Sequence, residues 1–122
     1  MTRVLIVDDS ALTREFHAHI VREVGFTCVT AVDGMDGLEK ATAEKVDVIL
    51  TDINMQGMDG YEFIRRARQN PDYDQVPIII ISTESREPDK QKGFKAGANL
   101  YLVKPTNANR IVESIRMLLG NR

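Results

Sequence analysis

Three acidic side chains stand where two aliphatic runs of the sequence end. Asp8 and Asp9 directly follow the run at residues 4–7, and Asp52 follows the run at residues 46–50. Both runs are predicted strands, and the carboxyl ends of parallel strands meet at one edge of a sheet, so we expect the three carboxylates to lie together. Carboxylates at such close range repel one another unless a hard cation neutralises them. The sequence therefore predicts a Mg²⁺ site, with Asp8 and Asp9 among its ligands.

Asp52 is the candidate nucleophile of this site, because a carboxylate at the tip of an aliphatic strand can attack a phosphorus atom held by the metal. A phosphoryl group carries negative charge on its oxygens and requires a cation and hydrogen-bond donors around it. Lys104 follows the aliphatic run at 100–103, and Ser82 follows the run at 78–81. Taken alone, an Asp-Asp-Ser sequence is typical of a helix N-cap. The coincidence of acids, hydroxyl and amine at four strand ends favours a phosphoryl-transfer site.

Five short apolar runs alternate with five segments of helical periodicity. The predicted strands are 4–7, 28–32, 46–50, 78–81 and 100–103, and the predicted helices are 12–24, 35–44, 60–69, 88–96 and 108–119. This alternation predicts an α/β fold with a doubly wound parallel sheet. In the first helix, Leu12, Phe16, Ile20 and Val24 recur every four residues and are expected to form its apolar face, whereas His17 is expected at the surface.

Length and composition narrow the class of protein further. The 122 residues carry a formal net charge of −2, which gives no sign of a nucleic-acid or membrane surface. The longest aliphatic run, at 76–81, is too short to span a bilayer. Cys28 is the one cysteine of the sequence and cannot form an internal disulfide, which is typical of a protein in a reducing compartment, so we expect a cytoplasmic protein. We expect residues 1–122 to form one domain with no effector domain attached.

Five short motifs resemble those of one known family. The motifs VDDS, DINMQGMDGYE, IISTES, GANLY and YLVKP are similar to those of the receiver domain of bacterial two-component response regulators, in particular the single-domain, CheY-like type. The resemblance implies a flavodoxin-like sheet in the strand order 2-1-3-4-5 with five helices. It also implies that Asp52 accepts a phosphoryl group, and that Asp8, Asp9, Asp52 and the main-chain carbonyl of Asn54 bind Mg²⁺, which Mn²⁺ can replace.

The same resemblance assigns roles to residues around the acceptor. It implies that Lys104 contacts the phosphoryl oxygens and that its peptide bond to Pro105 is cis. Ser82 lies 30 residues after Asp52 and 22 before Lys104, the spacing of the family's switch hydroxyl. The resemblance implies that Ser82 moves toward the phosphoryl group and that Tyr101 turns into the space released.

The sequence departs from the family pattern at three positions. Serine stands at position 82, where threonine is commoner, and Thr83 stands where alanine or glycine is usual. Thr106 stands where phenylalanine is frequent. Thr83 and Glu84 follow the switch hydroxyl directly and are expected to control access to the phosphoryl group, and hence the rate of dephosphorylation.

The resemblance implies a signalling switch rather than an enzyme, since the chain would catalyse only its own phosphorylation and dephosphorylation. A histidine kinase or a phosphotransfer protein would supply the phosphoryl group. The protein target would bind the face formed by the fourth helix, fifth strand and fifth helix, where Lys90, Lys92 and Lys95 lie. Neither nucleic acid nor membrane is an expected partner, and a monomer is expected. Asn54 and Glu84 are similar to the chemotaxis type, although a phosphorelay, or a phosphate sink or shuttle without direct output, would use the same site.

Two other functions compete with this interpretation. A phosphohydrolase with an aspartyl nucleophile needs a general acid, which haloacid-dehalogenase-like enzymes place two residues after the nucleophile. This sequence has Asn54 at that position, and an asparagine cannot serve as the acid. A carrier of flavin mononucleotide needs a phosphate-binding loop after the first strand, where Asp8 and Asp9 would repel the phosphate.

Overall fold

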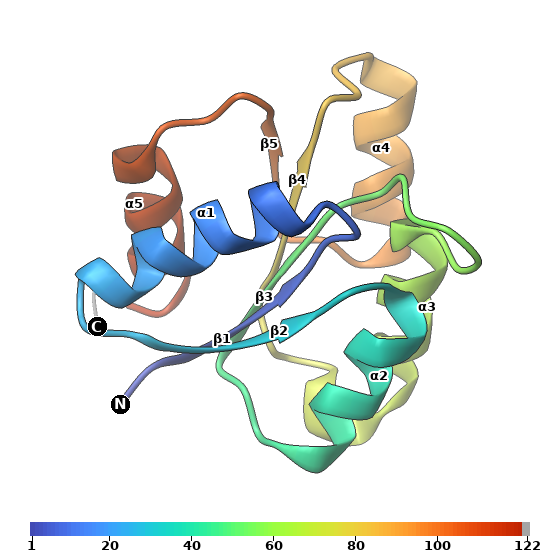
Figure 1. The fold of residues 1–122 in the computed structure, drawn as a ribbon. Helices are drawn as coiled ribbons and strands as arrows, with labels where there is room; N and C mark the ends of the chain where they lie inside the picture. Colours follow the sequence, from blue (N-terminus) through green and yellow to red (C-terminus); the bar gives the residue numbers. More distant parts are fainter. Residues whose placement is uncertain (121–122) are drawn as a thin grey trace.

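Within residues 1–120, which the computed structural model describes, five parallel strands form one sheet in the order β2-β1-β3-β4-β5 (Figure 1). The strands are β1 (Arg3–Val7), β2 (Thr27–Ala31), β3 (Val48–Thr51), β4 (Ile78–Ser82) and β5 (Leu100–Val103). The α-helices are α1 (Ala11–Glu23), α2 (Gly34–Ala43), α3 (Gly60–Gln69), α4 (Glu87–Ala96) and α5 (Ala108–Leu118). The α/β class and the strand order are both confirmed.

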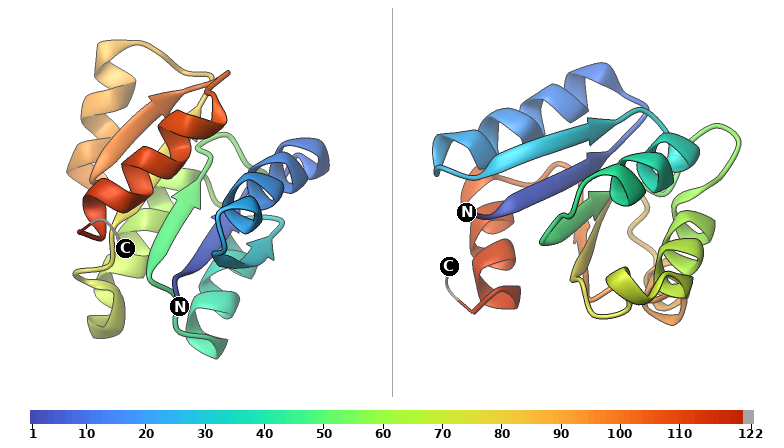
Figure 2. Two further views of the ribbon diagram at one scale, coloured as in Figure 1. Left: turned by 90° about the vertical axis from the view of Figure 1, so that its left-hand side faces the viewer. Right: turned by 90° about the horizontal axis from the view of Figure 1, so that it is seen from below.

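The helices cover both faces of the sheet, α1 and α5 on one side and α2, α3 and α4 on the other (Figures 1 and 2). Successive strand residues therefore point into different cores: Leu5 of β1 packs toward α2 and α3, while Ile6 packs toward α1 and α5. Burial on both faces explains why the strands are continuous aliphatic runs rather than alternating ones.

Local signals in the sequence fix several helix ends. Asp59 accepts a hydrogen bond from the Glu62 N–H at 2.9 Å and so caps α3. Gly25 and Gly97 follow α1 and α4 with φ angles of 90° and 127°, a region that favours glycine. None of the helices in the described part of the chain is both long and apolar enough to cross a membrane.

The expected apolar face of α1 is wrong at its N-terminal end. Leu12 is 83% exposed and Phe16 is also exposed, whereas His17 is only 4% exposed and is buried, like Ala18 and Val21 of the same helix. Residues four apart advance about 40° around a helix with 3.6 residues per turn, so a series with that spacing drifts away from the core. Of the four residues in the series, only Ile20 is buried, and His17 is not a surface residue.

Candidate functional site

The tips of β1 and β3 place the acidic residues together. The two strands are neighbours with Val7 opposite Thr51, and the Asp52 N–H donates to the Val7 carbonyl at 3.0 Å. Asp8 and Asp52 each follow the last residue of their strand, so both emerge at the same edge of the sheet. Carboxylate oxygens of Asp8, Asp9 and Asp52 lie within 4.8 Å of one another.

The three carboxylates differ in burial and in hydrogen bonding. Asp8 is buried, Asp52 is largely buried, and Asp9 is exposed. One oxygen of Asp8 accepts from the Ser10 N–H at 2.9 Å, and one oxygen of Asp52 accepts from the Ile53 N–H at 2.7 Å. Main-chain donors therefore fix one oxygen of each buried carboxylate and leave the second oxygen to face the site.

Lys104, directly after β5, extends into the site between the two buried carboxylates. Its Nζ lies 3.1 Å from Asp8 Oδ2 and 3.2 Å from Asp52 Oδ2. The Lys104 N–H also donates to the Ser82 carbonyl at 2.7 Å, and the Lys104–Pro105 peptide bond is cis. Burial raises the pKa of the Asp52 carboxyl above its usual range, although the Lys104 ammonium acts in the opposite direction.

One ammonium group faces three carboxylates at this site. Ionisation of all three therefore leaves an excess of negative charge, which a divalent cation would offset. The carboxylate of the exposed Asp9 and the Oδ2 atoms of Asp8 and Asp52, which Lys104 contacts, are hard oxygen donors of the kind that Mg²⁺ and Mn²⁺ prefer. The donor set thus fits the predicted metal.

The predicted switch residues form a hydrogen-bonded group close to Asp52. The buried Ser82 Oγ accepts from the Glu84 N–H at 3.1 Å, and the Glu84 carbonyl accepts from the Tyr101 hydroxyl at 2.7 Å. Asn54 donates its side-chain amide to Glu84 Oε1 at 3.1 Å. Glu84 therefore connects the loop after Asp52, the predicted switch hydroxyl and Tyr101.

Two residues that support the site were not identified from the sequence. Arg14, one turn into α1, donates from Nη1 to the Asp8 carbonyl at 2.7 Å and so fixes the peptide that joins Asp8 and Asp9. A Cβ atom on Gly60 would overlap the carbonyl oxygen of Asp52. The sequence holds a signal for Gly60, because a glycine directly after a helix cap is compatible with such a close approach.

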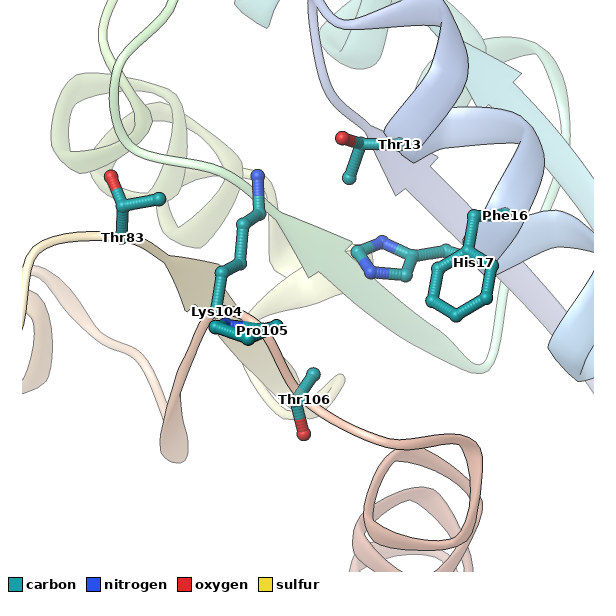
Figure 3. Close-up of a pocket in the computed structure, with 7 residues that line it drawn as sticks. All are labelled: Thr13, Phe16, His17, Thr83, Lys104, Pro105 and Thr106. Atoms are coloured by element: carbon teal, nitrogen blue, oxygen red, sulfur yellow. The ribbon is translucent and has the colours of Figure 1, made fainter.

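A cavity of about 330 Å³ opens beside Lys104 (Figure 3). In Figure 3 the His17 ring projects from α1 toward the side chain of Lys104, which comes from the loop after β5 on the other side of the cavity. Thr83 and Thr106, two of the three departures from the family pattern, both line this cavity. Burial lowers the pKa of His17, as does the nearby Lys104 ammonium.

Comparison with known proteins gives one consistent result. Residues 4–116 match the family described as the response regulator receiver domain. Protein PilH of Pseudomonas aeruginosa is 34% identical over 120 residues, which cover 98% of this chain and 99% of PilH. The gliding motility regulatory protein of Myxococcus xanthus is 38% identical over 102 residues, which cover 84% of this chain but 13% of that protein. The crystal structure of the chemotaxis protein CheY4 of Vibrio cholerae superposes with a TM-score of 0.93 at 36% identity, over 97% of this chain and 98% of CheY4.

Proposed function

This chain belongs to the response regulator receiver domain family, and we propose that it is a signalling switch phosphorylated on Asp52. The observation that carries the proposal is the convergence of three carboxylates and one ammonium group at one edge of the sheet. This arrangement holds the Asp52 carboxylate beside the Lys104 ammonium and beside carboxylates that would bind a cation, and both positive charges would offset the negative charge of a transferred phosphoryl group.

Asp8, Asp9 and Asp52, with the main-chain carbonyl of Asn54, would hold Mg²⁺. The ion, when bound, would neutralise the charge of the phosphoryl oxygens and orient them toward Asp52. Main-chain N–H groups already hold the Oδ1 atoms of Asp8 and Asp52 in place. These carboxylates therefore need little rearrangement to bind the ion.

A histidine kinase or a phosphotransfer protein would be the donor. A carboxylate oxygen of Asp52 forms a bond to phosphorus, the bond from phosphorus to the donor's imidazole nitrogen breaks, and the imidazole leaves with its electron pair. Lys104 stabilises the negative charge of the transferred oxygens. Water later hydrolyses the acyl phosphate and restores the carboxylate. The chain thus catalyses only reactions of its own side chain.

Phosphorylation would act on the group of residues around Glu84. If Ser82 Oγ turns toward the phosphoryl group, it gives up the hydrogen bond that it accepts from the Glu84 N–H. The Glu84 carbonyl is also the acceptor for Tyr101, so the loop after β4 and the Tyr101 ring would move together. The face formed by α4, β5 and α5 would present this change to a protein target, in a chemotaxis system or a phosphorelay.

Intact mass spectrometry tests the proposal. We expect the protein to gain the mass of one phosphoryl group when it is incubated with a small phosphodonor and Mg²⁺, and to gain none when Mg²⁺ is chelated. Asp52→Asn should abolish the gain, whereas Asp74→Asn, a change at an exposed carboxylate in the loop before β4, should not. Uptake that persists in Asp52→Asn would contradict the assignment of the acceptor.

A further inference from the structure

Helix α4 differs from its neighbours at its N-terminus. Within residues 1–120, it is the one α-helix without a side-chain hydrogen bond at its N-cap, which is Arg86. The other four are capped by Ser10, Asp33, Asp59 and Asn107. An N-cap satisfies main-chain N–H groups of the first turn and typically stabilises a helix by about 1 kcal/mol. The start of α4 therefore lacks one stabilising contact that the other four helices have.

Two tyrosine hydroxyls supply such contacts from neighbouring elements. Tyr61 of α3 donates to the Asp89 carbonyl in the first turn of α4, at 3.1 Å. Tyr101 of β5 donates to the Glu84 carbonyl in the loop before α4, at 2.7 Å. The segment from Glu84 to Asp89 is thus tied to the body of the protein at both of its ends.

The Tyr61 side chain is buried, and a cation lies over its ring. Tyr61 is 5% exposed, and Lys92 Nζ lies 4.6 Å from the centre of its ring. Burial raises the pKa of Tyr61 to about 12, so the hydroxyl keeps its proton and remains a donor at neutral pH. The second half of α4 is seated differently, because Gly93 lets it approach Ile80 so closely that a Cβ atom would lie 2.6 Å from Ile80 Cδ1.

The two tyrosine contacts differ in their connection to Asp52. The Tyr101 contact ends on Glu84, which also binds Ser82 Oγ and Asn54, so movement of Ser82 disturbs it directly. The Tyr61 contact ends on Asp89, five residues further along the chain. Movement of Ser82 can therefore release the loop before α4 while the Tyr61 contact persists.

We propose that Tyr61 is a positioning residue of the switch, whose hydroxyl holds the first turn of α4 at Asp89 and confines movement to the preceding loop. The role in confining movement rests on the proposed function. The hydrogen bond from the Tyr61 hydroxyl to the Asp89 carbonyl, which we call the tether, does not depend on that function. Because α4 forms one side of the face proposed to bind the target, Tyr61 determines how that face is presented in both states.

Hydrogen exchange of the unphosphorylated protein tests the tether. Tyr61→Phe removes only the hydroxyl and keeps the buried ring. Loss of one hydrogen bond predicts exchange about fivefold faster at the amides of residues 89–93, with exchange in α5 unchanged. Tyr73→Phe is the matched control, because the Tyr73 hydroxyl donates to the Ala41 and Glu44 carbonyls, away from α4. Unchanged exchange at 89–93, or an equal acceleration throughout the protein, would overturn the proposal.

A second comparison uses beryllofluoride with Mg²⁺ as an analogue of the phosphoryl group. In the wild type, we expect the analogue to change the exchange rates of residues 83–86 and to leave those of residues 89–93 within about twofold of their values without it. In Tyr61→Phe, the change should extend into residues 89–93. A residue that only fills space would give the same pattern in both proteins, and that result would refute the confining role. Failure of the proposed function would appear instead as no effect of the analogue on the wild type, while exchange of the free protein would still decide the tether.

Discussion

Replacement of Lys104 with methionine removes the ammonium group that separates two buried carboxylates and keeps most of the aliphatic side chain. In the wild type, the ammonium lies 3.1 Å from an oxygen of Asp8 and 3.2 Å from an oxygen of Asp52. The side chains of Lys104, Asp8 and Asp52 are 17%, 3% and 11% exposed, so water screens the contacts only weakly.

The size of the effect follows from these distances. At an effective dielectric constant of about 20, each contact of about 3 Å contributes roughly 5 kcal/mol of Coulomb attraction, most of which offsets the cost of burying the charges. Removal of one partner leaves the burial cost unopposed and typically lowers stability by about 3–5 kcal/mol. We expect Lys104→Met to lower the free energy of unfolding by about that much at pH 7 without Mg²⁺.

Urea denaturation with and without Mg²⁺ measures this loss and identifies its cause. An ion that binds only the folded protein adds about 2.7 kcal/mol to the free energy of unfolding when its concentration is 100 times the dissociation constant. We therefore expect Mg²⁺ to restore much of the stability of Lys104→Met. Lower pH should also restore part of it, because protonation removes the repulsion between the carboxylates. An equal loss with and without Mg²⁺, and at pH 7 and pH 5, would refute the electrostatic explanation.

Three further predictions concern single residues. Asp52→Asn leaves Lys104 paired with Asp8, unlike Lys104→Met, and should raise the free energy of unfolding at pH 7 without Mg²⁺, because burial raises the pKa of Asp52 and so makes its carboxylate unfavourable in the fold; a lower value in urea denaturation would contradict this. Gly60→Ala should lower stability by roughly 3 kcal/mol or more, because the new methyl group overlaps the Asp52 carbonyl; a change below about 1 kcal/mol would show that the loop can move aside. The folded pKa of His17 is lowered, so stability should fall as the pH drops through about 6.5, where the unfolded chain takes up a proton. The same titration of His17→Gln should lack this slope, and an identical slope in both proteins would assign it to another group.

The sequence was sufficient to predict the fold class and the convergence of the acidic residues. Parallel strands end at a common edge of the sheet. Residues that follow different aliphatic runs, such as Asp8 and Asp52, can therefore be predicted to lie together without knowledge of the structure. The strand order and the switch roles of Ser82 and Tyr101 came instead from the resemblance to a family.

Contacts between side chains of distant elements could not be predicted. The Tyr61 hydroxyl and the Asp89 carbonyl are 28 residues apart, and neither position differs in pattern from an ordinary helical residue. The burial of His17 was missed because the spacing of apolar residues in α1 indicates the wrong face near its N-terminus. In both cases the packing of one helix against its neighbours, rather than its own periodicity, determines the outcome.

Calorimetric titration of Mg²⁺ into the unphosphorylated protein tests most directly whether the three carboxylates form a metal site. We expect one ion to bind per chain, and its affinity to fall by more than about tenfold in Asp8→Asn, since loss of a ligand should cost at least as much as loss of a residue that supports one. Absence of binding at neutral pH, or an affinity that Asp8→Asn leaves unchanged, would contradict the account.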